Sequence, residues 1–282
     1  MDASSVVSSR GGRPRKSLGQ HWLTDHRYLR RIARAVATQP ETTLIEVGPG
    51  RGALTSLLAR LGKRLIGVEV DQALFLKLSE RFKDRKDVSL INADILTLWP
   101  ADLLKAEGAS PPYIVTGNLP YFIGTAIIRH FLRADPPPTR MIVTLQKEVA
   151  QSIVAAPGQM TYLSVEMQYF SEPRLLFEIP PQAFRPPPKV DSAVVRLEVR
   201  QQRQLARELE DSFLGFVQAG FAARRKRLRN SLAIGLREET QNVERLLEKA
   251  GIDATLRAQS LPVEDWIRLY TTYRHSASPT AQ

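Results

Sequence analysis

The chain has 282 residues, no cysteine, and 40 Lys and Arg against 29 Asp and Glu, which gives a net charge of +11. The lack of cysteine excludes disulfides, zinc–thiolate sites and thiol catalysis, and the four scattered histidines have no metal-ligand spacing, so we predict no metal site. No run of 18 apolar residues is present, so we expect no membrane span.

The charge is unevenly distributed along the chain. Residues 1–34 carry a net charge of +6, residues 35–199 carry +1, and residues 200–282 carry +4. Two basic ends around a nearly neutral middle indicate a polyanionic partner, most simply nucleic acid. The first 15 residues are rich in Ser, Gly and Arg without an apolar face, so we predict a disordered basic arm over 1–15.

A strand, a glycine-rich turn and a helix are predicted over residues 44–61. Gly48, Gly50 and Gly52 occupy alternate positions between the apolar strand 44–47 and a segment with helical spacing. Such a turn lets backbone approach a ligand closely. Glu69 ends the next predicted strand, where a carboxylate can accept both hydrogens of a ribose diol. Together these features predict an adenosine-containing cofactor.

Strands and helices then alternate regularly as far as residue 155. This pattern predicts the α/β class, with a parallel sheet and helices on both faces. Glu69, Asp94 and Asn118 each lie at or just past a strand end, so we expect them in one site at the carboxyl edge of the sheet. The predicted strands are 44–47, 64–69, 88–92, 113–116 and 141–145, and the predicted helices are 28–36, 53–61, 73–82, 98–105, 125–132 and 147–155.

The pattern changes after residue 159. A helix over 162–169, strands over 175–179 and 192–199, and the Pro-rich turn between them fit a closing antiparallel hairpin. Helical patterns follow at 209–221, 224–234, 243–250 and 263–270. We therefore predict an α/β domain over 16–200, a small all-helical domain over 201–275, and a polar tail over 276–282.

The segment most suggestive of chemistry is Asn118-Leu119-Pro120-Tyr121, at the end of a central strand. The Asn118 carbonyl and a main-chain carbonyl can together accept the two hydrogens of an exocyclic amino group. Tyr121 and Phe122 supply flat faces on which a base can stack. The amino group of adenine is a poor nucleophile, and two out-of-plane acceptors favour a pyramidal nitrogen. The electrophile that suits this arrangement is the sulfonium methyl of S-adenosylmethionine, with catalysis by positioning and electrostatics.

Several segments together resemble the ribosomal RNA adenine N6-dimethyltransferases, and most closely the small-subunit members of that family. The resemblance covers about residues 15–275. It implies a Rossmann-like S-adenosylmethionine-dependent methyltransferase domain followed by a small helical C-terminal domain that binds rRNA. It is carried by Gly-Gln-x-x-Leu at 19–23, Glu-Val-Gly-Pro-Gly-x-Gly-x-Leu-Thr at 46–55, Glu69, Asp94, residues 118–121, Leu-Gln-Lys-Glu at 145–148, residues 184–195, and residues 224–232.

The resemblance also implies the roles of individual residues. The cofactor positions are His21, Leu23, Gly48, Glu69, Asp94 and Asn118, with Gly48 under the methionine portion, Glu69 on the ribose and Asp94 on the adenine amino group. Residues 118–121 and Phe184 form the catalytic set, in which Phe184 resembles a second stacking aromatic opposite Tyr121. A core Phe before a turn is the alternative. One departure stands out, because relatives usually have Asn-Phe where this chain has His21-Trp22.

The substrate that the resemblance implies is a pair of adjacent adenosines in a hairpin loop near the 3′ end of small-subunit (16S) rRNA. Each receives two methyl groups, within a pre-30S ribosomal particle, from a cytoplasmic enzyme that is expected to be a monomer. Five basic residues within six positions exceed what solubility requires, so contact with RNA phosphate is favoured over a solvated helix face. These residues are Arg224, Arg225, Lys226, Arg227 and Arg229.

Three alternatives stay open on sequence grounds. A dinucleotide-dependent oxidoreductase is disfavoured by residues 118–121 and by the G-x-G-x-G spacing. A large-subunit rRNA adenine methyltransferase is closer kin, although residues 184–195 and the C-terminal helices favour the small-subunit enzyme. A non-catalytic assembly or transcription factor on the same fold is disfavoured by the intact Asn118 and Glu69.

Overall fold

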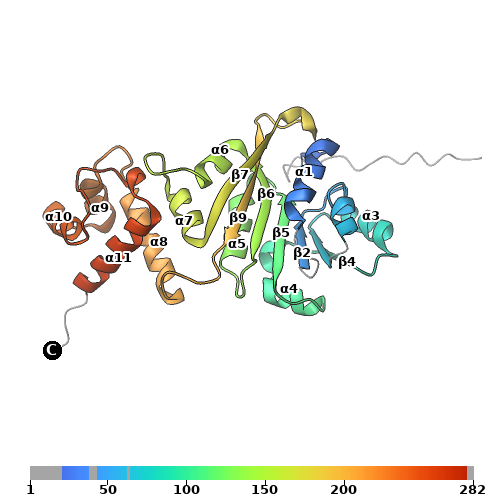
Figure 1. Ribbon diagram of the computed structural model, residues 1–282, viewed down its shortest axis with the longest axis horizontal. Helices are drawn as coiled ribbons and strands as arrows, with labels where there is room; N and C mark the ends of the chain where they lie inside the picture. The colour runs from blue at the N-terminus through green and yellow to red at the C-terminus, as the bar shows by residue number, and fades with distance from the viewer. Residues whose placement is uncertain (1–20, 38–42, 62–63, 278–282) are drawn as a thin grey trace, which may run out of the picture. The chain divides into compact units, whose positions relative to one another are not determined.

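The computed structural model describes residues 21–37, 43–61 and 64–277 (Figure 1). The predicted arm 1–15, Gly19, Gln20 and the end of the predicted tail lie outside the described residues. Two compact units divide the chain: one takes residues up to 138, 142–145 and 178–194, and the other takes 139–141, 146–177 and the rest. This division by packing differs from the predicted domain boundary near residue 200, which stays a prediction.

A seven-stranded sheet runs in the order β4-β3-β2-β5-β6-β9-β7. The pairs β2·β3, β2·β5 and β3·β4 are parallel, as the alternating pattern predicts. The central strand β2 is buried at every position, as expected for a strand covered on both faces. The strands are β2 (Thr43–Val47), β3 (Leu65–Glu69), β4 (Val88–Asn92), β5 (Tyr113–Asn118), β6 (Arg140–Gln146), β7 (Ser171–Ile179) and β9 (Ser192–Val199).

The helices of the α/β part follow the predicted segments, with one clear exception. The predicted helix 53–61 is reduced to α2 (Thr55–Leu58) and a 3₁₀ turn (Ala59–Leu61), because residues 49–54 are used for the turn closed by Gly52 N–H on the Pro49 carbonyl (2.9 Å). The others are α1 (His26–Val36), α3 (Gln72–Phe82), α4 (Pro100–Ala106), α5 (Gly124–Leu132), α6 (Lys147–Ile153) and α7 (Tyr162–Phe170), with a 3₁₀ turn at Ile95–Thr97.

A second, two-stranded sheet was not predicted. β1 (Trp22–Leu23) pairs antiparallel with β8 (Phe184–Arg185), so that Leu23 lies opposite Phe184. Strands of two residues have no readable periodicity, which is why the sequence pattern did not reveal them. The pairing joins the segment before α1 to the Pro-rich turn, so that Leu23 meets Phe184 from far along the chain.

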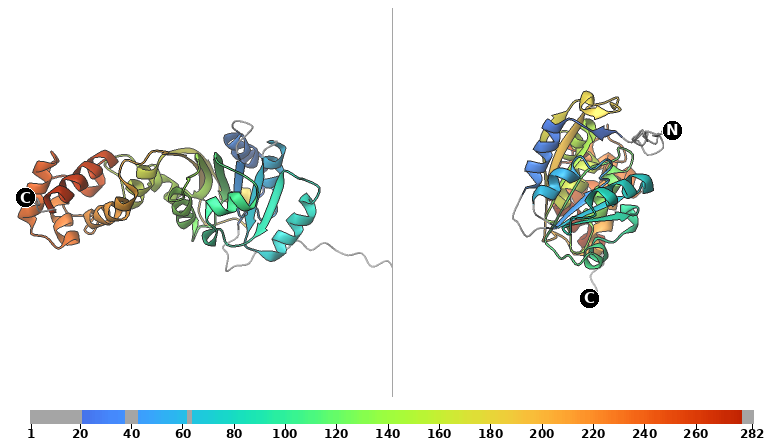
Figure 2. Two further views of the ribbon diagram at one scale, coloured as in Figure 1. Left: turned by 90° about the horizontal axis from the view of Figure 1, so that it is seen from below. Right: turned by 90° about the vertical axis from the view of Figure 1, so that its right-hand side faces the viewer.

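The C-terminal part is all-helical, as predicted, and Figure 2 shows no strand among its described helices. The prediction of a helix from residue 224 was wrong: residues 221–227 form turns, and α9 begins at Leu228. Ser231 Oγ fixes this connection, because it accepts from Ala223 N–H (2.9 Å) and donates to the Gly220 carbonyl (2.6 Å). The helices are α8 (Glu210–Gly220), α9 (Leu228–Leu236), α10 (Thr240–Lys249) and α11 (Val263–Ala277), with 3₁₀ turns at Arg207–Leu209 and Ala258–Ser260.

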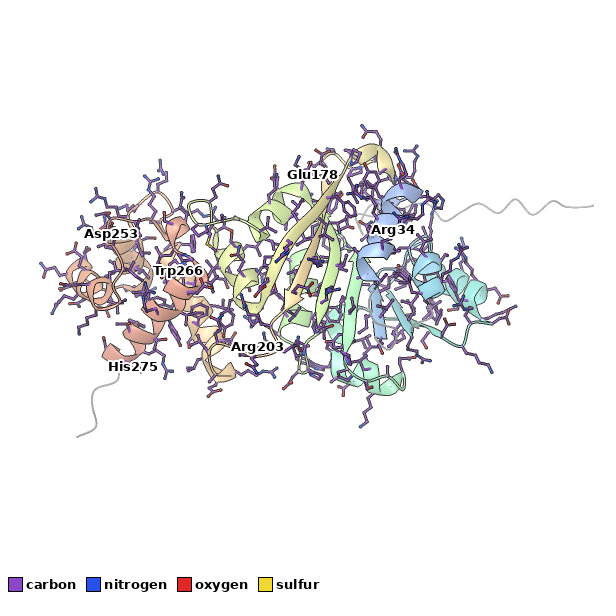
Figure 3. The ribbon with its side chains drawn as sticks, viewed as in Figure 1. Arg34, Glu178, Arg203, Asp253, Trp266 and His275 are labelled. Atoms are coloured by element: carbon purple, nitrogen blue, oxygen red, sulfur yellow. The ribbon has the colours of Figure 1, made fainter. Side chains whose placement is uncertain are left out.

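Trp266 forms the centre of this helical unit, where Figure 3 labels it on α11. Its side chain is fully buried against Phe216 and Phe221. A Cβ atom at Gly220 would collide with the Trp266 ring, so the close approach of α8 and α11 depends on that glycine. In the described part of the chain, every helix is too short or too polar to cross a bilayer.

Candidate active site

The loop after β2 is shaped by glycines in left-handed conformations. Gly48, Gly50 and Gly52 have φ angles of +65°, +60° and +75°, which side chains other than glycine adopt only with strain. A Cβ at Gly48 would meet nothing within 4 Å, so Gly48 is required for the backbone angle, and the space beside it is open. The loop thus leaves room for a ligand at the carboxyl end of β2.

Glu69, the last residue of β3, is tied to this loop. Its Oε2 accepts from Gly50 N–H (2.8 Å) and its Oε1 accepts from Asp71 N–H (2.9 Å). The residue is 3% exposed, and burial raises the pKa of its carboxyl. Each carboxylate oxygen can accept a further hydrogen bond. The predicted contact of Glu69 with a ribose therefore uses the remaining lone pairs, and it stays a prediction.

Glu46 is a second buried carboxyl, and the glycine motif to which it belongs did not mark it as a site residue. It is 1% exposed on the central strand, and burial raises its pKa to about 8. Its Oε2 has no hydrogen-bond partner among the described residues. A lone acid in an otherwise apolar strand was the available signal for this residue. A buried acceptor without a donor is costly, and a ligand that donates there would remove that cost.

Asn118 ends β5, and its side-chain amide is oriented by the backbone of residue 21. Asn118 Nδ2 donates to the His21 carbonyl (2.8 Å). Because a carbonyl can only accept, this bond directs Oδ1 the other way, where the oxygen is buried without a hydrogen-bond partner in the described part of the chain. The amide thus presents one unsatisfied acceptor at the carboxyl edge of the sheet.

The segment after Asn118 is anchored at both of its ends. Leu119 N–H donates to the Thr144 carbonyl (3.2 Å), and the Pro120 carbonyl accepts from Ile123 N–H (3.2 Å). Between these two bonds, the Leu119 carbonyl accepts no backbone hydrogen bond among the described residues, so it is an available main-chain acceptor one residue after Asn118.

Tyr121 is held by two contacts that the sequence analysis did not predict. Its hydroxyl hydrogen-bonds to Ser192 Oγ (2.7 Å), and its ring stacks on His21 with centroids 5.8 Å apart and an interplanar angle of 24°. His21 is itself fixed by a bond between Nδ1 and the Pro186 carbonyl (2.9 Å). Burial raises the pKa of the Tyr121 phenol, so it stays protonated near neutral pH.

Phe184 is fully buried beside Leu23 in the small sheet. At 0% exposure its ring can stack on a base only after a rearrangement, so its predicted stacking role stays a prediction. The exposed aromatic next to Tyr121 is Phe122, at 62%. Trp22 is one of the two residues that depart from the family pattern. It packs on Gly50, and the Arg51 guanidinium lies over its ring, 3.8 Å from the centroid.

Part of this site lines a cavity of about 240 Å³, whereas His21, Glu69, Tyr121 and Phe184 do not line it. Its walls come from α1, the β1 segment, the glycine loop, Glu46 and Asn118, while Leu23, Leu29 and Leu54 make the wall partly apolar. The cavity thus combines apolar surface, a buried carboxyl and a buried amide oxygen. S-adenosylmethionine has matching chemistry, because its ammonium and hydroxyl groups can donate to the unpartnered oxygens of Glu46 and Asn118, and its adenosine suits an apolar wall. The residues present fit this cofactor.

Asp94 lies two residues past β4 and is exposed. One of its carboxylate oxygens accepts from Leu96 N–H (3.0 Å) and caps the short 3₁₀ turn that follows. The predicted contact of Asp94 with the cofactor's adenine is a second role beyond this cap, and it stays a prediction.

Comparison with known proteins decides the family. A profile of the ribosomal RNA adenine dimethylases matches residues 11–275 of this chain. The chain belongs to the ribosomal RNA adenine dimethylase family. A Ribosomal RNA small subunit methyltransferase A from Dehalococcoides mccartyi is 41% identical, over 93% of this chain and 89% of that protein. The protein of the same name from Moorella thermoacetica is 37% identical, over 96% of each chain.

Two solved structures confirm the fold of this dimethylase. The 23S rRNA methyltransferase ErmE superposes with a TM-score of 0.71 at 28% identity, over 89% of this chain and 98% of that one. A dimethyladenosine transferase from Plasmodium falciparum superposes with a TM-score of 0.77 at 20% identity, over 90% and 98% of the two chains. The predicted Rossmann-like methyltransferase fold with a helical C-terminal region is confirmed. The dimethylase is an S-adenosylmethionine-dependent methyltransferase.

The basic cluster of the dimethylase divides into two parts. Arg224, Arg225, Lys226 and Arg227 are exposed on the turns between α8 and α9. Arg229 is half-buried on α9, where its Nη1 forms an ion pair with Glu244 of α10. The first four residues are available to a phosphate, whereas Arg229 already has a carboxylate partner.

Proposed function

We propose that this chain transfers methyl groups from S-adenosylmethionine to the N6 amino groups of two adjacent adenosines in the hairpin loop near the 3′ end of small-subunit rRNA, giving dimethyladenosines. The observation that carries the proposal is the buried, unsatisfied Asn118 Oδ1, fixed in direction by the bond from Nδ2 to the His21 carbonyl. Such an acceptor calls for a donor that the described residues do not supply, and the adenine amino group is such a donor.

The chain's own residues act on the adenine amino nitrogen by holding its protons. Asn118 Oδ1 and the Leu119 carbonyl accept the two N–H groups, which favours a pyramidal nitrogen whose lone pair leaves the ring plane. The ring of Tyr121, fixed by Ser192 and His21, supports the base from one side. Because this set positions the nitrogen without needing a strong base, catalysis rests on orientation and electrostatics.

The proposed cofactor residues include three that line the cavity: Leu23, Gly48 and Asn118. S-adenosylmethionine supplies an electrophilic methyl group when bound. The open space at Gly48 would admit its methionine portion, a donor group of the cofactor could reach the unpartnered Glu46 Oε2, and Glu69 would hold its ribose. Leu23 and Asn118 line the cavity, and His21 and Asp94 would contact the cofactor from outside that lining.

The small-subunit substrate is supported by the relatives named small subunit methyltransferase, at 37–41% identity over nearly the whole chain. The alternative with support is a large-subunit substrate, since the ErmE structure is a 23S rRNA methyltransferase. Within the proposal, the chain acts as a monomer in the cytoplasm on a pre-30S particle. The exposed cations at residues 224–227 contact its phosphates.

Methyl transfer to purified particles tests the proposal. The chain is incubated with labelled S-adenosylmethionine and, separately, with unmethylated small and large ribosomal subunits, and the methylated bases are then mapped. We expect label on two adjacent adenosines of small-subunit rRNA, as N6,N6-dimethyladenosine. Label confined to large-subunit rRNA, or no label on either particle, would contradict the proposed function.

A further inference from the structure

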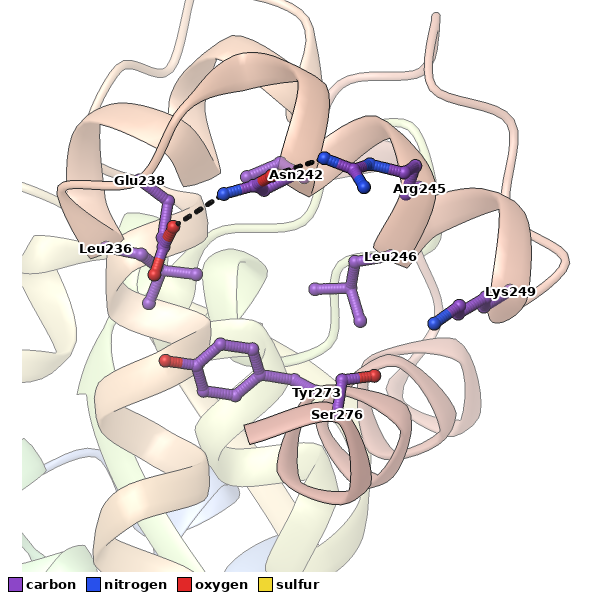
Figure 4. A pocket seen from close by; sticks show the side chains of 9 residues that line it. Leu236, Glu238, Asn242, Arg245, Leu246, Lys249, Tyr273 and Ser276 are labelled. Atoms are coloured by element: carbon purple, nitrogen blue, oxygen red, sulfur yellow. Dashed lines mark hydrogen bonds between the residues drawn. The ribbon is translucent and has the colours of Figure 1, made fainter. Parts of the chain in front are cut away.

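A second cavity, of about 340 Å³, lies wholly within the C-terminal helical unit (Figure 4). It is enclosed by the end of α9, one face of α10 and the last turns of α11. Asn242, Arg245, Leu246 and Lys249 line it from α10, at the spacing of residues that share one helix face. Nothing in the proposed methyl transfer uses this cavity.

The floor of this cavity is apolar and carries one aromatic ring. Leu236, Val243 and Leu246 form the apolar surface, and Figure 4 shows the Tyr273 ring facing the side chains of Leu236 and Leu246. Phe216 supports Tyr273 from behind, with centroids 5.0 Å apart and an interplanar angle of 34°. A braced, half-exposed phenol over an apolar floor is a stacking surface for a flat ring.

The rim of the cavity carries two cations without anionic partners. Arg245 donates to the Asn242 side-chain oxygen (2.7 Å) and the Gln241 carbonyl (3.5 Å), both of which are uncharged. Lys249 makes no ion pair with any residue that the structure describes. Like charges at positions i and i+4 of a helix repel one another, and a bound anion between them would remove that repulsion.

Next to Arg245, the rim continues as an oriented polar edge. Asn242 Nδ2 donates to Glu238 Oε2 (3.2 Å), so an amide and a carboxylate face the same opening (Figure 4). Such a pair can hydrogen-bond to the edge of a base. The cavity therefore combines a ring-stacking floor, an edge that can bind a base and a pair of cations that can bind phosphate.

We propose that this cavity binds one unpaired nucleotide of the small-subunit rRNA, with its base on Tyr273 and its phosphate on Arg245 and Lys249. The inference rests on the proposed function, because a chain that acts on rRNA brings its C-terminal unit to RNA. Single-stranded bases are bound by stacking together with cationic contact to the backbone, which is the chemistry of this cavity. The nucleotide lies outside the methylated loop, and the cavity anchors the C-terminal unit to the substrate.

The test uses the full chain and unmethylated small subunits. Affinity is measured for the wild type, for Tyr273→Leu, which keeps apolar volume but removes the ring face, and for Arg245→Gln with Lys249→Gln. The control pair Arg257→Gln with Arg274→Gln removes two exposed cations of the same unit that do not line the cavity. We expect about tenfold weaker binding for each cavity variant, and less than about twofold for the control.

Chemical probing of the rRNA bases in each complex identifies the occupant. We expect at least one unpaired base outside the methylated loop to be protected by the wild type and the control pair, and exposed in both cavity variants. Equal affinity and equal protection in all four proteins would overturn the proposal. Weaker binding of the cavity variants without any change in base protection would also overturn the proposal, because the cavity would then be occupied by a protein of the small subunit.

Two further outcomes separate this inference from its alternatives. The wild type is titrated with free adenosine monophosphate, and micromolar binding that Tyr273→Leu abolishes would assign the cavity to a free nucleotide and overturn the rRNA occupant. Methyl transfer by the wild type is measured alongside. If the wild type methylates small subunits and the cavity variants bind them with unchanged affinity, only the cavity proposal is contradicted. If the wild type transfers no methyl group, the proposed function is contradicted.

Discussion

A single buried acid on the central strand, Glu46, links the cofactor cavity to the pH dependence of stability. Its folded pKa is about 8, well above the ordinary value near 4.5. The unfolded chain therefore loses this proton near pH 4.5 while the folded chain keeps it up to about pH 8. The contribution of this proton to the free energy of unfolding is therefore fully present below pH 4.5 and is lost as the pH rises towards 8.

Replacement of Glu46 by Gln tests this dependence. We expect Glu46→Gln to match the wild type in free energy of unfolding near pH 4.5 and to exceed it by about 2 kcal/mol or more at pH 8, because the amide has no proton to lose. Denaturant titrations at a series of pH values measure the difference. Glu80→Gln, on the exposed face of α3, is the control that should show no such trend. A constant difference between Glu46→Gln and wild type across this range would show that Glu46 is ionised in the folded chain.

At the scale of elements, α8 and α9 are packed closely through a glycine. A Cβ at Gly235 would collide with the backbone of Ala219, so Gly235→Ala must push the two helices apart. Alanine ordinarily stabilises a helix interior relative to glycine by about 1 kcal/mol. Here we expect a net loss of about 1–3 kcal/mol from overpacking, seen as a lower Tm.

Gly215 is the matched control for that substitution. It lies on the exposed side of α8, where an added Cβ would meet nothing within 4 Å. Gly215→Ala should therefore raise the Tm slightly, by the ordinary helix propensity. If Gly235→Ala is as stable as Gly215→Ala, the two helices are less closely packed than their backbones indicate.

Elements with strong periodicity were predictable, and those set by single contacts were not. The strands 88–92 and 192–199 were predicted at their observed bounds, because each is a short segment with β-branched and apolar residues between turns, although 88–92 is a half-buried edge strand. The start of α9 was misplaced by four residues, because the Arg-rich segment has helical propensity while Ser231 fixes the turn. Pairing of β1 with β8 depends on chain segments far apart in sequence, which no local pattern encodes.

The candidate site shows the same division. Strand ends and glycines predicted where Gly48, Glu69 and Asn118 would lie, because parallel strands end at one edge of a sheet. The partners that fix side chains were not predictable: the stacking of His21 on Tyr121, and the bond from Ser192 to the Tyr121 hydroxyl, need the folded geometry. The full burial of Phe184 was likewise not predictable, because the sequence shows only an aromatic residue before a run of prolines.

For the whole molecule, binding to RNA should depend on salt through the exposed cations at residues 224–227. Replacing Arg224, Arg225 and Arg227 together by Gln removes up to three phosphate contacts. We expect the slope of log affinity against log salt to become shallower by about 2–3, with cofactor affinity unchanged. The measurement is a series of binding curves on small subunits at different salt concentrations.

Arg229→Gln is the control for the salt experiment, because it removes a cation that already has a carboxylate partner. Because Arg229 is paired with Glu244, its loss should lower the Tm while leaving the salt slope nearly unchanged. A triple variant with the wild-type slope would place the RNA phosphates elsewhere on the molecule.

The central claim is that Asn118 Oδ1 holds the amino group that receives the methyl, and single-turnover methyl transfer by Asn118→Ala on unmethylated small subunits tests it most directly. We expect a loss of about 10²–10³-fold in rate, because the lost contact acts mainly in the transition state. Affinity for the particle and the Tm, measured on the same preparation, should stay close to those of the wild type. A folded Asn118→Ala that retains most of the wild-type single-turnover rate would contradict the account.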